Sequence, residues 1–450
     1  MKASKYNIFI PDEDEDQYIL YNSLSGAIFA IDEEMKTFIE EGLKYDDSHL
    51  DKPEIISKLS EQGIILNGNQ DELKICKVRY DKFRYNYFGL LFTIVLTYNC
   101  NLACPYCYEG EKKYESSIST LKGDNTYKVV QFIKNQTKEL NSKVFSVYLF
   151  GGEPLLNYKE GTQILGELQK WADENDRIMF IGIISNGTLL DDQICEDLKK
   201  YKVMHTQLTI DGPRPIHNKK RPYKNGKGTY NDIISSLKLL ISNQINTKLR
   251  INIDLDNYNK IEPLLDDLIS EGLSGLRLTF SVISPMTNAC KAYSSYLVDE
   301  AKIAKIIPKL WSLAIEKGFN LDLRPINSPT YCGSMTDSSY IIDPNLDIYR
   351  CFGSVGDRNH VIGRISNGKF EKNYNYYNYM SRCPFDFDFE KYKKCETCDL
   401  LPSCGGGCAL ASWVKYGTYN KPACGYLTNL IKERIKLYLK IKHLQESPNK

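Results

Sequence analysis

The sequence predicts an α/β protein built around a partial (β/α)6 barrel. Between residues 91 and 320, apolar strand-like runs alternate six times with segments of helical periodicity. Alternation at this spacing indicates parallel strands joined by right-handed crossovers. Three cysteines follow the first strand-like run, and a second group lies between residues 332 and 424. Six units are fewer than the eight of a closed barrel, so we expect an open barrel with its chemistry at the carboxyl ends of the strands.

The composition is that of an ordinary globular protein of 450 residues, with 42% hydrophobic and 26% charged side chains. A formal net charge of +1 gives no reason to expect nucleic acid as a partner. No apolar run approaches the ~20 residues that span a bilayer, and the N-terminus lacks a signal-peptide pattern. We therefore expect a cytoplasmic protein with no membrane partner, in which the 14 cysteines bind metal or stay reduced.

The first of three predicted domains covers residues 1–90. Three strand-like runs come first and three helical runs follow, one of which has a clear apolar stripe. The expected strands are 6–10, 17–21 and 27–31, and the expected helices are 34–41, 53–62 and 71–80. A small sheet backed by helices resembles the winged-helix-like domain that recognises leader peptides in maturation enzymes. A packing appendage without a ligand is the alternative.

The second predicted domain, residues 91–320, is the barrel. Each strand candidate is short, apolar and followed by an amphipathic helix. The expected strands are 92–97, 144–150, 178–185, 205–210, 249–255 and 276–283. The expected helices are 126–140, 161–172, 191–200, 230–241, 261–270 and 297–317.

The third predicted domain, residues 321–450, is rich in cysteine and poor in apolar periodicity. A hairpin of 339–342 and 347–349 is expected between the first two cysteines of this segment. Little regular structure is expected after it until a helix near 427–444. Such a segment needs additional stabilisation, which bound metal clusters would supply.

Cys100, Cys104 and Cys107 carry the most informative spacing in the chain, C-x3-C-x2-C. Three thiolates can hold a [4Fe–4S] cluster at three corners and leave the fourth iron without a protein ligand. A substrate or cofactor can bind that open iron. A zinc site with its fourth ligand elsewhere, or three reduced core cysteines, are the alternatives.

Gly151, Gly152, Glu153 and Pro154 stand at the end of the second expected strand. The glycines allow the backbone to approach a ligand closely, and the carboxylate of Glu153 suits an ammonium group. Together with the cysteine motif, this segment resembles the radical S-adenosylmethionine (SAM) superfamily. In that family the amino and carboxylate groups of SAM bind the open iron, and the glutamate–proline motif meets the amino group. Reductive cleavage of SAM then gives a 5′-deoxyadenosyl radical that abstracts a substrate hydrogen.

The resemblance implies further SAM contacts after later strands. Tyr106 matches the aromatic position near the adenine, and Ser185-Asn186 matches a site that contacts the ribose or the carboxylate. Arg221 looks like the arginine that binds the SAM carboxylate, and Asn257 is a weaker match. His217 is open between a packing and a functional role. No catalytic residue beyond the cluster and SAM is implied.

The C-terminal cysteines resemble the SPASM domain, which binds two auxiliary [4Fe–4S] clusters, so the cofactors implied are SAM and three clusters. A zinc ribbon at the first C-x2-C pair is the alternative. The implied ligands of the outer cluster are Cys395, Cys398, Cys404 and Cys424, and those of the inner cluster are Cys332, Cys351 and Cys408. No fourth inner ligand stands between the first two of these, so the inner cluster either recruits Cys383 or keeps an open iron. An open iron could bind a substrate thiolate.

Two groups of SPASM enzymes fit this pattern. Anaerobic sulfatase maturases, which form formylglycine, carry an aspartate base directly after the second SPASM cysteine, where this chain has Phe352. The other group crosslinks ribosomally made precursor peptides (RiPPs). We therefore predict a peptide maturase that forms a Cys thioether, with carbon–carbon crosslinking or sulfatase maturation as alternatives and a non-catalytic electron carrier as a further one. The implied partners are a precursor peptide with a leader and a flavodoxin- or ferredoxin-type reductant.

Overall fold

The computed structural model describes residues 1–12, 16–41, 53–109, 118–297, 299–324, 328–330, 332–387 and 393–446. The chain divides into two compact units. The barrel unit comprises Asn86–Asp322 and Asp337–Met380, and the cysteine-rich unit comprises Met1–Tyr85, Leu323–Thr336 and Ser381–Lys450. The N-terminal segment thus shares a compact unit with the C-terminal cysteines, and the division into three domains stays a prediction.

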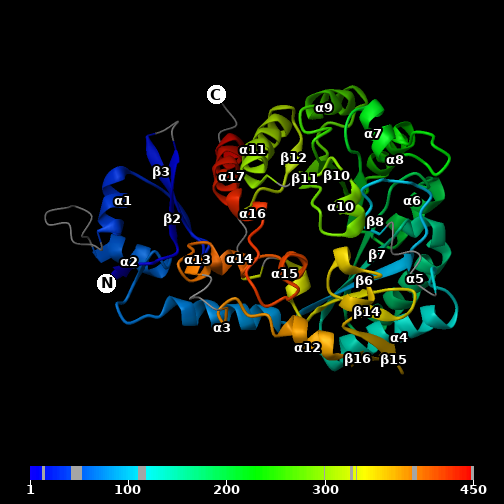
Figure 1. Cartoon of the computed structure of the whole chain (residues 1–450), viewed down its shortest axis with the longest axis horizontal. Coiled ribbons are helices and arrows are strands. Elements are labelled where there is room, and N and C mark those ends of the chain that lie inside the picture. Colours follow the sequence, from blue (N-terminus) through cyan, green and yellow to red (C-terminus); the bar gives the residue numbers. More distant parts are fainter. Residues whose placement is uncertain are drawn as a thin grey trace. The chain divides into compact units, whose positions relative to one another are not determined.

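The barrel unit is built on one 11-stranded sheet with the order β12-β11-β10-β9-β8-β7-β6-β13-β14-β15-β16 (Figure 1). The strands from β12 to β13 pair in parallel, and those from β13 to β16 pair antiparallel. The six expected strands are present, and the predicted α/β fold with a partial barrel is confirmed. They are β6 (Gly89–Thr97), β7 (Val144–Gly151), β8 (Ile178–Ile184), β9 (His205–Thr209), β10 (Thr247–Ile253) and β11 (Arg277–Val282), and the short β12 is Asn320–Leu321.

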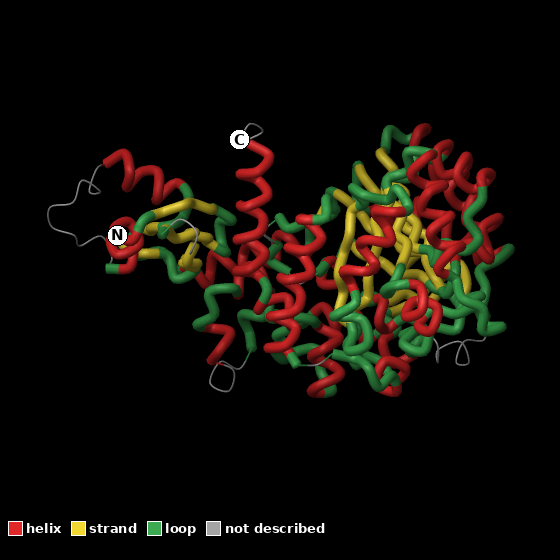
Figure 2. The backbone as a smooth tube through the Cα atoms, turned by 90° about the horizontal axis from the view of Figure 1, so that it is seen from above, coloured by secondary structure: helices red, strands yellow, loops and turns green. Residues whose placement is uncertain are grey.

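Helices cover the outer face of this sheet, as Figure 2 shows for the strands drawn in yellow. Phe92 of β6 meets Phe132 of α4 edge to face at 6.0 Å between ring centroids, and Phe145 of β7 lies against Trp171 of α5. The helices of this unit are α4 (Asp124–Glu139), α5 (Tyr158–Glu174), α6 (Asp192–Lys200), α7 (Arg214–Lys220), α8 (Tyr230–Ser242), α9 (Ile261–Ser270), α10 (Asn288–Ala292), α11 (Glu300–Glu316) and α12 (Tyr374–Met380).

Side chains that alternate with these outward-facing ones line the inner face of the curved sheet. The ring of Tyr148 lies across Gly182, where a Cβ atom would clash with it, and is 6.0 Å from the ring of His205. These three residues come from β7, β8 and β9, so they identify the inner face on three neighbouring strands.

The expected hairpin is present as β13 (Ser339–Ile342) and β14 (Asp347–Tyr349), and β13 extends the sheet by pairing with β6. The expectation of little regular structure after it is wrong. Strands β15 (Gly363–Ser366) and β16 (Lys369–Lys372) follow, and then α12. These strands hold only four residues each, which is too short to show the two-residue alternation of a strand. They are stabilised by pairing at the edge of the large sheet.

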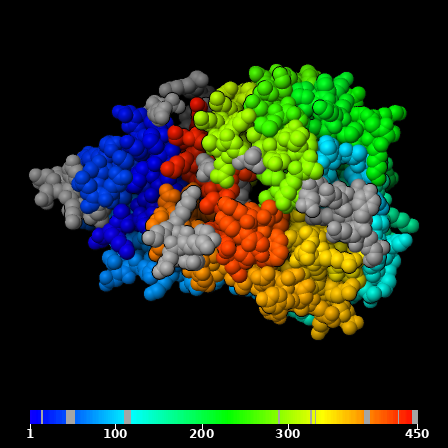
Figure 3. Space-filling model, in the orientation of Figure 1, coloured from blue at the N-terminus to red at the C-terminus, as the bar shows by residue number. Residues whose placement is uncertain are grey.

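The cysteine-rich unit contains a three-stranded antiparallel sheet with the order β2-β3-β4. Its isoleucines pack against Ile431 and Ile435 of the C-terminal helix α17, whose red atoms touch the blue N-terminal segment in Figure 3. The strands are β1 (Lys2–Ala3), β2 (Asn7–Asp12), β3 (Gln17–Asn22), β4 (Ile28–Ile31) and β5 (Ile65–Leu66), and the helices are α1 (Glu33–Glu40), α2 (Pro53–Glu61), α3 (Glu72–Arg84), α13 (Lys393–Glu396), α14 (Leu401–Cys404), α15 (Ala409–Tyr416), α16 (Tyr426–Asn429) and α17 (Ile431–Glu446).

Within the described part of the chain, no helix is both long enough and apolar enough to cross a bilayer.

Replacing Phe132 by alanine tests how much the outer layer stabilises the barrel. The ring is fully buried and contacts Phe92 and Tyr340 edge to face. We expect Phe132→Ala to lower the free energy of unfolding by about 3–5 kcal/mol, because a buried aromatic ring is lost and a cavity remains. Tyr127→Ala on the same helix is the control, since Tyr127 is 57% exposed. Equal losses of thermal stability in the two variants would contradict this packing.

Candidate functional site

The loop after β6 brings three half-buried thiols close together. The pKa of Cys104 is raised to about 11 and that of Cys107 to about 12, chiefly by burial and in part by the charge of Cys100. Each thiol therefore lies close enough to its neighbours to respond to their charge. Without a cation Cys104 and Cys107 are protonated at neutral pH, whereas a metal cluster would stabilise all three thiolates.

The glycine turn after β7 lies directly against this cysteine loop. The amide of Gly152 donates to the carbonyl of Thr97 at 2.8 Å, and that of Glu153 donates to the carbonyl of Asn99 at 2.9 Å. A Cβ atom on Gly152 would lie 2.6 Å from the Tyr98 oxygen and 2.5 Å from the Asn99 oxygen. Only glycine allows this approach, so the turn and the cysteine loop share one backbone arrangement.

Glu153 is fully buried and binds to the end of the next strand. Its carboxylate accepts hydrogen bonds from the Ser185 hydroxyl at 2.8 Å, the Asn186 amide at 2.7 Å and the Leu155 amide at 3.0 Å. Burial raises the pKa of this carboxyl group, while the three donors oppose that shift. The carboxylate expected to meet an ammonium group thus also holds the turns after β7 and β8 together.

The side chain of Asn186 continues this connection to the cysteine loop. Its Nδ2 donates to Oδ1 of Asn101 at 2.8 Å and lies 3.8 Å from the sulfur of Cys100. Its own Oδ1 accepts from the backbone amide of Thr188 at 2.9 Å. The structure therefore brings the predicted residues Ser185 and Asn186 to the cysteine motif.

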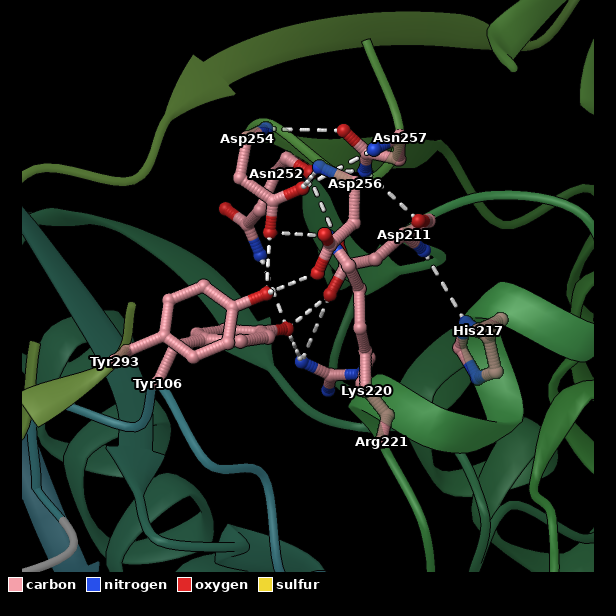
Figure 4. Close-up of polar contacts among 10 residues, drawn as sticks. All are labelled: Tyr106, Asp211, His217, Lys220, Arg221, Asn252, Asp254, Asp256, Asn257 and Tyr293. Carbon is pink, nitrogen blue, oxygen red and sulfur yellow. Dashed lines mark hydrogen bonds and ion pairs between the residues drawn. The ribbon is translucent and has the colours of Figure 1, made fainter. Parts of the chain in front are cut away.

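Tyr106 and Arg221 belong to a buried polar network at the carboxyl ends of β9 and β10 (Figure 4). The Tyr106 hydroxyl donates to Asp211, and Arg221 Nη1 donates to the Tyr106 oxygen at 2.9 Å. A further donor, Asn252 Nδ2, lies 3.4 Å from the same oxygen. Asn252 was not predicted as a site residue. Along β10 it alternates with the residues whose side chains face outward, and this alternation could have indicated that it faces the inner side of the barrel.

Arg221 keeps one donor available. Its side chain is 11% exposed, and its Nε is buried without a hydrogen-bond partner among the described residues. Native proteins rarely leave such a group unpaired, so an anion is the expected partner. This orphaned donor fits the carboxylate of SAM that the sequence assigns to Arg221.

The side chain of Asn257, in contrast, makes its hydrogen bonds to other groups of the chain. It is fully buried, and its Nδ2 donates to the carbonyls of Asp211 at 2.8 Å and Asn252 at 2.7 Å. Its Oδ1 accepts from the Asp254 amide at 2.9 Å. The structure thus shows Asn257 tying together the loops after β9 and β10, and its contact with SAM stays a prediction.

His217 is a packing residue. The Asp211 amide donates to its Nδ1 at 3.1 Å. Thr229 Oγ1 donates to the carbonyl of Arg221, which leaves that oxygen to accept from His217 Nε2 at 3.0 Å. Burial lowers the pKa of His217 well below its ordinary value, so the imidazole is neutral with its proton on Nε2.

A second group of cysteines gathers in the cysteine-rich unit. The pKa of Cys404 is raised to about 12, chiefly by burial and in part by the charges of three other cysteines, which places those thiols nearby. They are the remaining predicted ligands of the outer cluster, Cys395, Cys398 and Cys424. The turn between Cys404 and Cys408 consists of three glycines with positive φ, and a Cβ atom on Gly407 would clash with the carbonyl of Ala423.

The predicted ligands of the inner cluster are divided between the two compact units. Cys332 lies close enough to Cys408 for its charge to raise the pKa of that thiol, which burial also raises. Cys351 belongs to the barrel unit, where it follows β14. Cys383 lies beside Asp386 and Lys77. Among the described residues, no three cysteine, histidine or acidic side chains are arranged to hold one single metal ion.

Gly152→Ala tests the contact between the glycine turn and the cysteine loop. We expect a loss of about 1–3 kcal/mol of stability and a lower iron content after reconstitution, because the new methyl group displaces the backbone at Tyr98 and Asn99. Gly68→Ala is the control, since a Cβ atom there meets nothing within 4 Å. Iron analysis and thermal unfolding measure both effects. Normal iron loading in Gly152→Ala would show that the loop does not depend on this contact.

The comparisons with known proteins agree with this site. Residues 94–268 match the model of the Radical SAM superfamily. The cyclopropyl synthase TigE of Paramaledivibacter caminithermalis is 23% identical, over 94% of this chain and 93% of its own. The cysteine-type anaerobic sulfatase-maturating enzyme of Clostridium novyi is 21% identical, over 69% of this chain and 85% of its own.

A solved structure shows the same fold. Streptococcus suis SuiB bound to its precursor peptide SuiA matches with a TM-score of 0.55 at 16% identity, over 94% of this chain and 99% of SuiB. The matched residues include the cysteine loop, the glycine turn and Arg221. Residues 94–268 therefore form a radical SAM domain, in a chain that is similar over most of its length to a radical SAM enzyme.

Proposed function

We propose that this enzyme modifies a ribosomally made precursor peptide and joins a cysteine sulfur of that peptide to a carbon atom. One observation supports a peptide substrate. The chain resembles a protein whose structure was solved with its precursor peptide, and this likeness covers 94% of the chain, including the N-terminal segment. When bound, SAM and its cluster supply the radical that removes hydrogen from the substrate carbon. Thioether formation then removes two hydrogens from the peptide in total.

The N-terminal sheet offers a place for the leader of that peptide. Strands β2 and β4 are the outer strands of the three-stranded sheet, so each has one edge that pairs with no strand of this sheet. An extended peptide can bind such an edge through main-chain hydrogen bonds. This supports the leader-recognition role that we predict for residues 1–90.

Phe352 argues against sulfatase maturation. It stands where that group carries an aspartate base, and its ring meets Phe150 edge to face at 5.0 Å. A phenylalanine cannot accept a proton. The likeness to a protein named as a cyclopropyl synthase favours carbon–carbon bond formation as the second candidate.

The auxiliary cysteines complete the proposal. Cys395, Cys398, Cys404 and Cys424 would hold the outer cluster, and Cys332, Cys351 and Cys408 the inner one, for three clusters in all. The gathering of the first four around Cys404 supports the outer set. The fourth inner ligand is either Cys383 or the substrate thiolate, and a flavodoxin- or ferredoxin-type protein would supply electrons.

Reconstituted enzyme with SAM and dithionite tests the radical chemistry. We expect Cys104→Ala to abolish 5′-deoxyadenosine formation, because a ligand of the SAM-binding cluster is lost. We expect Cys398→Ala to retain SAM cleavage and to lose the modified peptide. Cys195→Ala is the control, since Cys195 is a buried thiol on α6 away from both cysteine groups in the sequence. SAM cleavage that survives Cys104→Ala would refute the assignment of the cluster.

The peptide encoded beside the gene tests the product. We expect mass spectrometry to show the loss of two hydrogens and iodoacetamide to label one thiol fewer than in the unmodified peptide. Loss of two hydrogens with every thiol still reactive would establish a carbon–carbon bond instead. SAM cleavage with no change in any precursor peptide would contradict the proposed function.

A further inference from the structure

The inner face of the barrel carries a positively charged wall below the cysteine loop. On β10 the inward-facing residues are those that alternate with the buried apolar ones, namely Lys248, Arg250 and Asn252. Arg277 is the register partner of Lys248 on β11. His205 faces the same side, and its pKa is lowered by burial and then by the charges of Lys248 and Arg277. These side chains place positive charge on the inner face of β10 and β11.

Arg250 is the cation of this wall nearest to the radical SAM site. Its Nε donates to Oδ1 of Asn252 at 2.8 Å, and Asn252 in turn lies 3.4 Å from the Tyr106 hydroxyl. Its charge also acts on the phenol of Tyr108, the residue after Cys107. Two hydrogen-bonding steps therefore connect the guanidinium to the cysteine loop.

The two terminal nitrogens of the Arg250 guanidinium have no hydrogen-bond partner among the described residues. Among the described residues, its side chain makes the single hydrogen bond to Asn252, and no carboxylate forms an ion pair with it. Its register partners on the two adjacent strands are Thr209 and Thr279, which are small. A planar guanidinium fixed through Nε presents its two terminal nitrogens as a fork that matches a carboxylate.

Aromatic side chains lie on the inner side of two other strands of the barrel. Phe150 of β7 contacts Phe352, which is 37% exposed, and Phe180 on the inner side of β8 is 39% exposed. Accessible aromatic side chains and a fixed cation on one inner face are typical of a site that orients a segment with one acidic side chain.

We infer that Arg250 binds a carboxylate side chain, Asp or Glu, of the peptide that the enzyme modifies, and so sets which residue lies next to the SAM site. This inference rests on the proposed function in taking the bound carboxylate to belong to a peptide. It makes Arg250 a residue for substrate specificity, distinct from Arg221, whose orphaned Nε suits the carboxylate of SAM.

Equilibrium dialysis with the reconstituted holoenzyme and SAM tests this binding directly. The probes are two capped pentapeptides that differ only in a central glutamate or glutamine. We expect the wild-type enzyme to bind the glutamate peptide about threefold to tenfold more tightly, the range for a charge-assisted pair that is partly exposed to water. Arg250→Gln should lose this preference, and Arg250→Lys should keep part of it.

Lys238→Gln is the matched control, because it removes one positive charge from an exposed ion pair on α8. It should keep the full preference. Equal binding of the two peptides by the wild type, or a preference that persists in Arg250→Gln, would overturn the inference. A parallel loss of SAM cleavage in Arg250→Gln would also overturn it, since Arg250 would then act on SAM. Dialysis needs no turnover, so a wild type that prefers glutamate but modifies no peptide would contradict only the proposed function.

Discussion

The close approach of the Gly152 backbone to Tyr98 and Asn99 is the contact on which the site depends. It leaves no room for a Cβ atom, and it joins the turn after β7 to the loop after β6 through two backbone hydrogen bonds. The buried carboxylate of Glu153 then fixes the turn after β8, and Asn186 returns from that turn to the cysteine loop. Three strand ends therefore act as one rigid support for the three thiols.

A buried polar network extends this support across the barrel. Tyr106, Asp211, Arg221 and Asn252 are connected by hydrogen bonds, and Lys220 forms an ion pair with Asp254. Burying so many charged groups is costly unless each has a partner. The Nε of Arg221 is buried without a hydrogen-bond partner among the described residues, and it belongs to a residue that the sequence assigns to SAM. The network thus separates positions that hold the fold, such as His217, from positions that remain available to a ligand.

The strands of the barrel could be predicted because each is followed by an amphipathic helix, and both periods are visible in the sequence. β6 to β11 lie close to the expected ranges for this reason. The four-residue strands β15 and β16 could not be predicted, because their stability comes from pairing, of β15 with β14 and of β16 with β15, rather than from their own residues. Asn252 and Tyr293 were missed as site residues for a similar reason. Tyr293 reaches Asp254 and the ring of Tyr106 only through the folding of the segment after β11.

The sequence by itself determined the chemistry of this protein, because the spacing of Cys100, Cys104 and Cys107 and the turn at Gly151–Pro154 are local patterns. It also determined the α/β barrel, through the alternation of two periods. Only the tertiary structure decided how these parts are used. It showed that Glu153 and Asn257 hold neighbouring strand ends together, and that the guanidinium of Arg250 faces the inner side of the barrel. Such roles depend on which distant backbone and side-chain groups become neighbours, and no local pattern records that.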